Sequence, residues 1–196
     1  MSIFKTHQEL SPLSPSDSEA SQRVLRTHEL LDLDDDQMIL VGSAAMALYG
    51  IKLSPFDPID INQTMTPRPS DLDFATSPLY MQTLYDPGVP LGSHVTPSGH
   101  PLHAEQLTNG LVKLRIETPE LPVDLLSGFR DERDSLTRFD EAFRRYTHAN
   151  SRPVEGSTLR VITPRAMRRE LAKRQRVGLD PKAKSDLARL RMTQLR

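Results

Sequence analysis

The stretch VGSAAMALYG, residues 41–50, decides the fold that we expect for this chain. The apolar run 38–41 predicts a short buried strand, and the small residues after the Gly-Ser pair predict a compact helix over 43–49. Gly50 is typical of the position just past a helix C-terminus. A strand that turns directly into a helix at Gly42 and Ser43 offers backbone N–H groups to a phosphate-bearing ligand.

Two later stretches, PSDLDF (69–74) and LPVDLL (121–126), carry three aspartates. Alternate side chains of a strand share a face, so Asp71 and Asp73 should aim two carboxylates at one point while Leu72 turns into the core. Asp124 lies inside an apolar run, where an unpaired carboxylate is unfavourable. Neighbouring carboxylates repel unless they bind a cation, and Mg²⁺ suits them. The pattern predicts a Mg²⁺ site, with pairing of Asp124 to an arginine as the alternative.

The order Gly-Ser, helix, Asp-x-Asp and a later strand aspartate resembles the nucleotidyltransferase superfamily that includes DNA polymerase beta. The resemblance extends to its minimal bacterial forms, among them the AbiEii-type toxins, and covers about residues 38–127. It implies that Gly42 and Ser43 hold a nucleoside triphosphate. It also implies that Asp71, Asp73 and Asp124 are catalytic and hold two Mg²⁺ ions, so that the protein is expected to be a nucleotidyltransferase.

The C-terminal region is strongly basic. Residues 165–196 hold 11 basic and 3 acidic side chains, a net charge of +8, although the whole chain has a formal net charge of −1. The segment RRELAKRQRVGLDPKAKSDLARL (168–190) resembles the helices that close these small domains, and Lys173 and Lys184 are the candidates for neutralising the triphosphate. Such a region also suits an acidic or nucleic-acid partner.

The resemblance leaves the acceptor open between RNA, a protein side chain and a small molecule such as an aminoglycoside. It also admits a cognate antitoxin or another regulatory partner.

One departure from the family pattern is the segment IKLSPFDPIDINQTMTPRP (51–69), which separates the helix from the Asp-x-Asp pair. Asp57 and Asp60 within it form a second acidic pair, ranked lower because Pro55 and Pro58 favour a turn over a strand.

We expect a mixed α/β (α+β) fold, a small twisted mixed sheet flanked by helices. The predicted organisation is a poorly ordered N-terminus over 1–17, a nucleotidyltransferase-like domain over 18–162 and a basic helical segment over 163–196. The alternation of apolar and polar residues predicts a half-buried strand over 112–117. Helices are predicted over 18–33, 79–85, 134–146 and from 164 onward, the last interrupted at Gly178.

Bulk properties narrow the class of protein. Cysteine is absent, which excludes disulfides, thiolate metal sites and a cysteine nucleophile. No apolar run approaches the roughly 20 residues that span a bilayer, and the first twenty residues lack the apolar core of a signal peptide. The sequence therefore predicts a cytoplasmic protein with no membrane partner.

Two other functions stay open at this point. The fold could serve as a catalytically inactive binding or regulatory module, or the activity could lie in a nucleic-acid-binding C-terminal region. Convergence of Asp71, Asp73 and Asp124 on one point beside Ser43 would favour catalysis.

Overall fold

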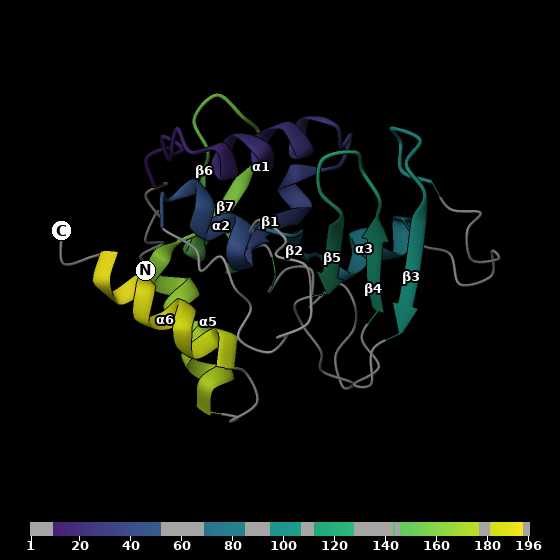
Figure 1. Ribbon diagram of the computed structural model, residues 1–196. Coiled ribbons are helices and arrows are strands. Elements are labelled where there is room, and N and C mark those ends of the chain that lie inside the picture. The colour runs from purple at the N-terminus through teal and green to yellow at the C-terminus, as the bar shows by residue number, and fades with distance from the viewer. Residues whose placement is uncertain are drawn as a thin grey trace, which may run out of the picture.

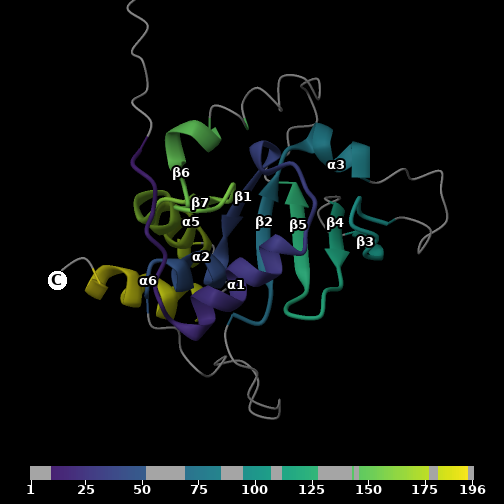
Figure 2. The same cartoon turned by 90° about the horizontal axis from the view of Figure 1, so that it is seen from above.

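The computed structural model describes residues 10–51, 69–84, 95–106, 112–127, 143, 146–176 and 181–193. Within them is a seven-stranded mixed sheet in the order β3-β4-β5-β2-β1-β7-β6, which can be followed across Figure 2. The strands are β1 Met38–Val41, β2 Leu72–Thr76, β3 Leu102–Gln106, β4 Val112–Ile116, β5 Val123–Ser127, β6 Ser151–Pro153 and β7 Arg160–Ile162. The predicted mixed α/β class is confirmed.

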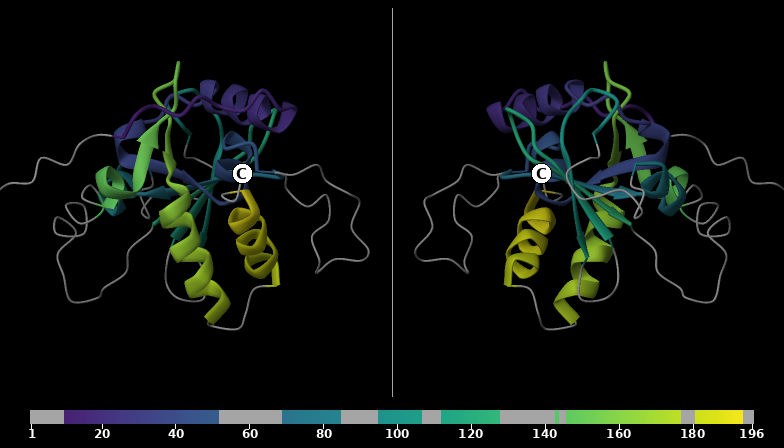
Figure 3. Two further views of the ribbon diagram at one scale, coloured as in Figure 1. Left: turned by 90° about the vertical axis from the view of Figure 1, so that its left-hand side faces the viewer. Right: turned by 90° about the vertical axis from the view of Figure 1, so that its right-hand side faces the viewer.

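The helices in the described residues flank this sheet. They include α1 Glu19–Glu29, α2 Gly42–Leu48, α3 Pro78–Leu84, α5 Pro164–Arg176 and α6 Pro181–Thr193, with a short 3-10 turn η1 at Asp35–Gln37. Helix α1 lies on one side of the molecule, and α5 and α6 lie together on the opposite side (Figures 1 and 3). None of the helices described is long and apolar enough to cross a bilayer.

The centre of the sheet combines parallel and antiparallel pairs. Strand β2 is antiparallel to β1 and parallel to β5, while β4 is antiparallel to both β5 and β3. Parallel neighbours keep corresponding residues side by side, so Asp73 of β2 lies directly beside Asp124 of β5. The topology thereby joins two segments that are distant in the sequence.

The core follows the alternation predicted from the sequence. Leu72 and Phe74 of β2 and Leu114 and Ile116 of β4 are fully buried, whereas the residues between them point to the other face of the sheet. Leu72 therefore turns into the core, as predicted. Burying such aliphatic and aromatic side chains stabilises the fold by about 1.5–3 kcal/mol each, so the central strands are firmly held.

Several boundaries differ from the predicted ones. Helix α1 ends at Glu29 instead of residue 33. The prediction placed the end too late because the pattern of apolar residues continues past the last helical turn, and Leu31 is still buried. Its N-cap is Ser18, whose hydroxyl accepts a hydrogen bond from the Ser21 N–H at 3.2 Å. Strand β6 was not predicted, because three residues that include a proline carry no alternation. Most of the predicted helix 134–146 lies outside the described residues.

Two other predictions concern the ends of the chain. The predicted helix from 164 onward is present as α5, and Thr163 caps it, since its hydroxyl accepts a hydrogen bond from the Ala166 N–H at 3.3 Å. Residues 1–9 lie outside the described residues, but Leu13 forms backbone hydrogen bonds with Pro153 and Glu155. The Ser16 N–H donates to the Leu48 carbonyl at 3.0 Å, so residues 10–17 follow β6 and α2.

Candidate metal centre

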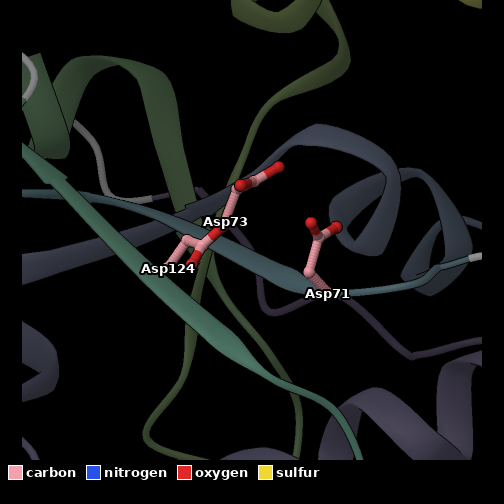
Figure 4. Close-up of side chains that lie close together, drawn as sticks. All are labelled: Asp71, Asp73 and Asp124. Carbon is pink, nitrogen blue, oxygen red and sulfur yellow. The ribbon is translucent and has the colours of Figure 1, made fainter. Parts of the chain in front are cut away.

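Three acidic side chains gather on one face of the sheet at β2 and β5. Asp73 and Asp124 are register partners, and Asp71 lies two residues before Asp73 on the same face. One carboxylate oxygen from each of the three lies within 4.8 Å of the others. Figure 4 shows the three side chains projecting from the neighbouring strands toward one region. The structure thus brings together the three aspartates that the sequence singled out.

Burial makes this cluster costly without a counter-charge. Asp124 is 4% exposed, and Asp71 and Asp73 are half-buried. Like charges on directly opposed strand residues destabilise a sheet, and carboxylates that share a site repel. Carboxylate oxygens are the ligands that Mg²⁺, Ca²⁺ and Mn²⁺ prefer. The cluster could therefore hold a metal ion.

The Gly-Ser turn lies against the cluster. Gly42 has a φ of +68°, and a β-carbon at this position would lie 2.7 Å from Asp73 Oδ2. Both the left-handed backbone and the close carboxylate require glycine here. Ser43, the next residue, is 5% exposed, so little of its side chain is open to a ligand. Its predicted role in holding phosphates stays a prediction.

Two basic residues of β4 neutralise Asp124. Lys113 Nζ lies 2.9 Å from Asp124 Oδ2, and Arg115 Nη1 lies 3.5 Å from Asp124 Oδ1. Arg115 is the register partner of Asp124, and Lys113 lies two residues along on the same face. The arginine pairing that the sequence left as an alternative for Asp124 is therefore present, together with a closer lysine.

Arg115 is held from a second side. Its Nε donates to Glu117 Oε1 at 2.9 Å. This hydrogen bond raises the pKa of Arg115, burial lowers it, and the nearby charges of Asp124 and Asp71 raise it again. The net effect is a raised pKa, so the guanidinium is a permanent positive charge beside the carboxylates.

Sequence reasoning missed these two basic residues. The alternation over 112–117 placed Lys113 and Arg115 on the polar face of a strand, but it gave no indication of which strand lies beside them. Adjacency to β5 is a long-range pairing. A basic residue at every second position of a strand, with an aspartate inside a nearby apolar strand, is the signal that could have suggested the contact.

The predicted phosphate-binding lysines lie elsewhere. Lys173 on α5 is exposed, and its Nζ lies 3.0 Å from Glu170 Oε1. Lys184 on α6 is exposed as well, and within the described ranges neither lysine contacts the three carboxylates. Asp57 and Asp60, the lower-ranked acidic pair, lie outside the described residues.

No protein-family model, curated protein or solved structure matches this chain. What can be said of its function therefore comes from the fold and from this cluster of carboxylates.

Proposed function

We propose that the protein is a Mg²⁺-dependent nucleotidyltransferase that moves a nucleoside monophosphate from a nucleoside triphosphate to a hydroxyl acceptor. The observation that supports it is the gathering of Asp71, Asp73 and Asp124 beside the turn at Gly42. Two divalent cations held there would stabilise the attacking and leaving oxygens of an in-line displacement. The resemblance in the order of the motifs supports the same reaction.

Each residue has a distinct role in this proposal. Asp71 and Asp73 would hold both cations, and Asp124 would hold the one nearer the acceptor. Asp124 also takes up the proton of the acceptor hydroxyl, whose oxygen forms the new bond to the α-phosphorus while pyrophosphate leaves. The missing side chain at Gly42 lets the β- and γ-phosphates approach the backbone.

The proposed acceptor is RNA, a protein side chain or a small molecule. Exposed basic residues on α5 and α6 support an acceptor that carries phosphates, because proteins bind phosphates with Lys and Arg side chains. Four tyrosines, six phenylalanines and no tryptophan leave few side chains for stacking on bases, which weakens the preference for RNA. An association with a cognate antitoxin or another regulatory partner belongs to the same proposal.

Transfer of radiolabel tests the reaction. The protein is incubated with each α-³²P-labelled nucleoside triphosphate, MgCl₂ and either total RNA or cell extract. Label transfer should occur in one mixture, disappear in EDTA and fall at least about 100-fold in Asp73→Asn, the scale on which catalytic electrostatics act. Asp36→Asn, an exposed acid on η1, is the matched control and should keep transfer. Absence of both transfer and triphosphate binding would reject the proposal.

A second candidate is a non-catalytic binding module on the same fold. The ion pairs that Lys113 and Arg115 form with Asp124 favour it, because they already neutralise part of the acidic cluster. Binding of a nucleoside triphosphate without label transfer to any acceptor would favour this module over the enzyme.

A further inference from the structure

We propose that Lys113 is a built-in counter-ion of the three carboxylates, and that a divalent cation displaces it from Asp124 on binding. The released ammonium then pairs with the phosphates of the bound nucleotide. The inference rests on the proposed function and deepens it, because it assigns a residue that couples the binding of metal and nucleotide.

The first support is the contact itself. Lys113 Nζ lies 2.9 Å from Oδ2 of Asp124, and the lysine side chain is 19% exposed against 5% for the aspartate. A carboxylate buried beside two others is stabilised by a nearby cation. Removing that cation would leave an uncompensated buried charge, which is strongly destabilising. Lys113 thus supplies charge at the place where a metal ion would supply it.

The second support is the other oxygen of the same carboxylate. Asp124 Oδ1 is buried and has no hydrogen-bond partner among the described residues. Its nearest charge, Arg115 Nη1 at 3.5 Å, is beyond the roughly 2.7–2.9 Å of a charge-assisted hydrogen bond. A buried carboxylate oxygen without a hydrogen bond, within the acidic cluster, retains lone pairs for a metal ion.

The two basic residues differ in chemistry. Arg115 carries a planar guanidinium that also donates a 2.9 Å hydrogen bond to Glu117, whereas Lys113 carries a compact ammonium on a four-carbon stem with several rotatable bonds. A divalent cation among the carboxylates places positive charge beside the ammonium and repels it. Lys113, and not Arg115, is therefore the group that yields.

This exchange makes a quantitative prediction. In the metal-free protein, the cation must compete with Lys113 for Asp124, so Mn²⁺ should bind more weakly than the three carboxylates alone would allow. Nucleotide gives the displaced ammonium a new anionic partner and should strengthen Mn²⁺ binding. Such coupling between two ligands is typically about 5- to 150-fold, and it is reciprocal.

The test measures Mn²⁺ binding to the full chain without nucleotide, by electron paramagnetic resonance of free Mn²⁺ and by calorimetry. Lys113→Gln should bind Mn²⁺ on the order of tenfold more tightly than wild type. Lys113→Arg keeps the charge and should bind no more tightly than wild type. Arg191→Gln, which removes one positive charge from an exposed site on α6, should leave the affinity unchanged.

Thermal unfolding gives a second readout. Lys113→Gln should melt at a lower temperature than wild type in EDTA, because the carboxylates lose their counter-ion. MgCl₂ or MnCl₂ should raise its melting temperature more than it raises that of wild type. If Lys113→Gln does not fold in EDTA, restoration of folding by MnCl₂ supports the exchange.

The outcomes separate this inference from the proposed function. Unchanged or weaker Mn²⁺ binding by Lys113→Gln, with label transfer intact in wild type, overturns the displacement alone. Tighter binding by Lys113→Gln without label transfer in any mixture supports the displacement and rejects the enzyme. Failure of both wild type and Lys113→Gln to bind Mn²⁺ overturns both.

Discussion

Gly42→Ala tests whether the turn and the acidic cluster form one unit. An alanine at a φ of +68° is strained by about 1–2 kcal/mol, the usual penalty for an L-residue in the left-handed region. Its β-carbon would also lie 2.7 Å from Asp73 Oδ2. The backbone of Asp73 is held between Val41 of β1 and Asp124 of β5, so the overlap must be relieved by rotation of the Asp73 side chain, which moves its carboxylate.

The expected loss of stability combines these two terms. Relief of the overlap should cost roughly another 1–3 kcal/mol, as overpacking usually does, so unfolding free energy should fall by about 2–5 kcal/mol in total. At about 2–4 °C per kcal/mol for a chain of this size, the melting temperature should drop by roughly 4–20 °C. Because the carboxylate of Asp73 is displaced, Mn²⁺ affinity and label transfer should fall as well.

Gly156→Ala is the matched control. Gly156 has a φ of +73°, and a β-carbon there would meet nothing within 4 Å, so only the backbone strain of about 1–2 kcal/mol applies. Urea titrations of wild type and both variants, with Mn²⁺ titrations alongside, separate strain from contact. Equal destabilisation of the two variants, with unchanged Mn²⁺ affinity in Gly42→Ala, would refute the link between the turn and Asp73.

Three further predictions concern the scaffold. Burial raises the pKa of Asp35, but hydrogen bonds with His28 and Thr158 outweigh burial and lower that pKa. Asp35→Asn should therefore lower the free energy of unfolding by about 2 kcal/mol at pH 7, measured by urea titration. This loss should be full above about pH 4, the ordinary aspartate range, and shrink as the pH falls through the lowered pKa; a loss independent of pH would contradict it. Burial raises the pKa of Tyr49 to about 12, and its hydroxyl has no hydrogen-bond partner in the described part of the chain. Calorimetry should therefore find Tyr49→Phe no less stable than wild type. A clear loss of stability would contradict this and reveal a hydrogen-bond partner of the hydroxyl. Thr163→Ala removes the cap of α5 and should cost about 1 kcal/mol, measured by thermal unfolding against Thr163→Ser, which should cost less.

Much of the central sheet could be predicted because its signals are local. The alternation around Leu72 predicted that Asp71 and Asp73 share one face of a strand, and the small residues after Gly42 predicted the compact helix. Burial of Asp124 followed from its apolar neighbours. Each of these inferences used side-chain spacing within one element, which backbone geometry fixes.

The missing parts depended on pairing between distant segments. The sequence did not show that β4 lies beside β5, so Lys113 and Arg115 were not connected to Asp124. Likewise, β6 exists because β7 offers it a hydrogen-bonding edge, and its residues Ser151–Pro153 carry no strand pattern of their own. Long-range adjacency is determined by the packing of the whole sheet, which local periodicity does not encode.

The parallel register of β2 and β5 would limit the ion selectivity of a metal site built on these strands. Adjacent strands are held about 4.8 Å apart by their backbone hydrogen bonds, and Asp73 and Asp124 start from equivalent points on that ladder. The anchor points of these two carboxylates therefore cannot spread to admit a larger ion or contract around a smaller one. For a cation bound there, discrimination between Mg²⁺, Mn²⁺ and Ca²⁺ would arise from side-chain torsions and retained water molecules, because the spacing of the backbone is fixed.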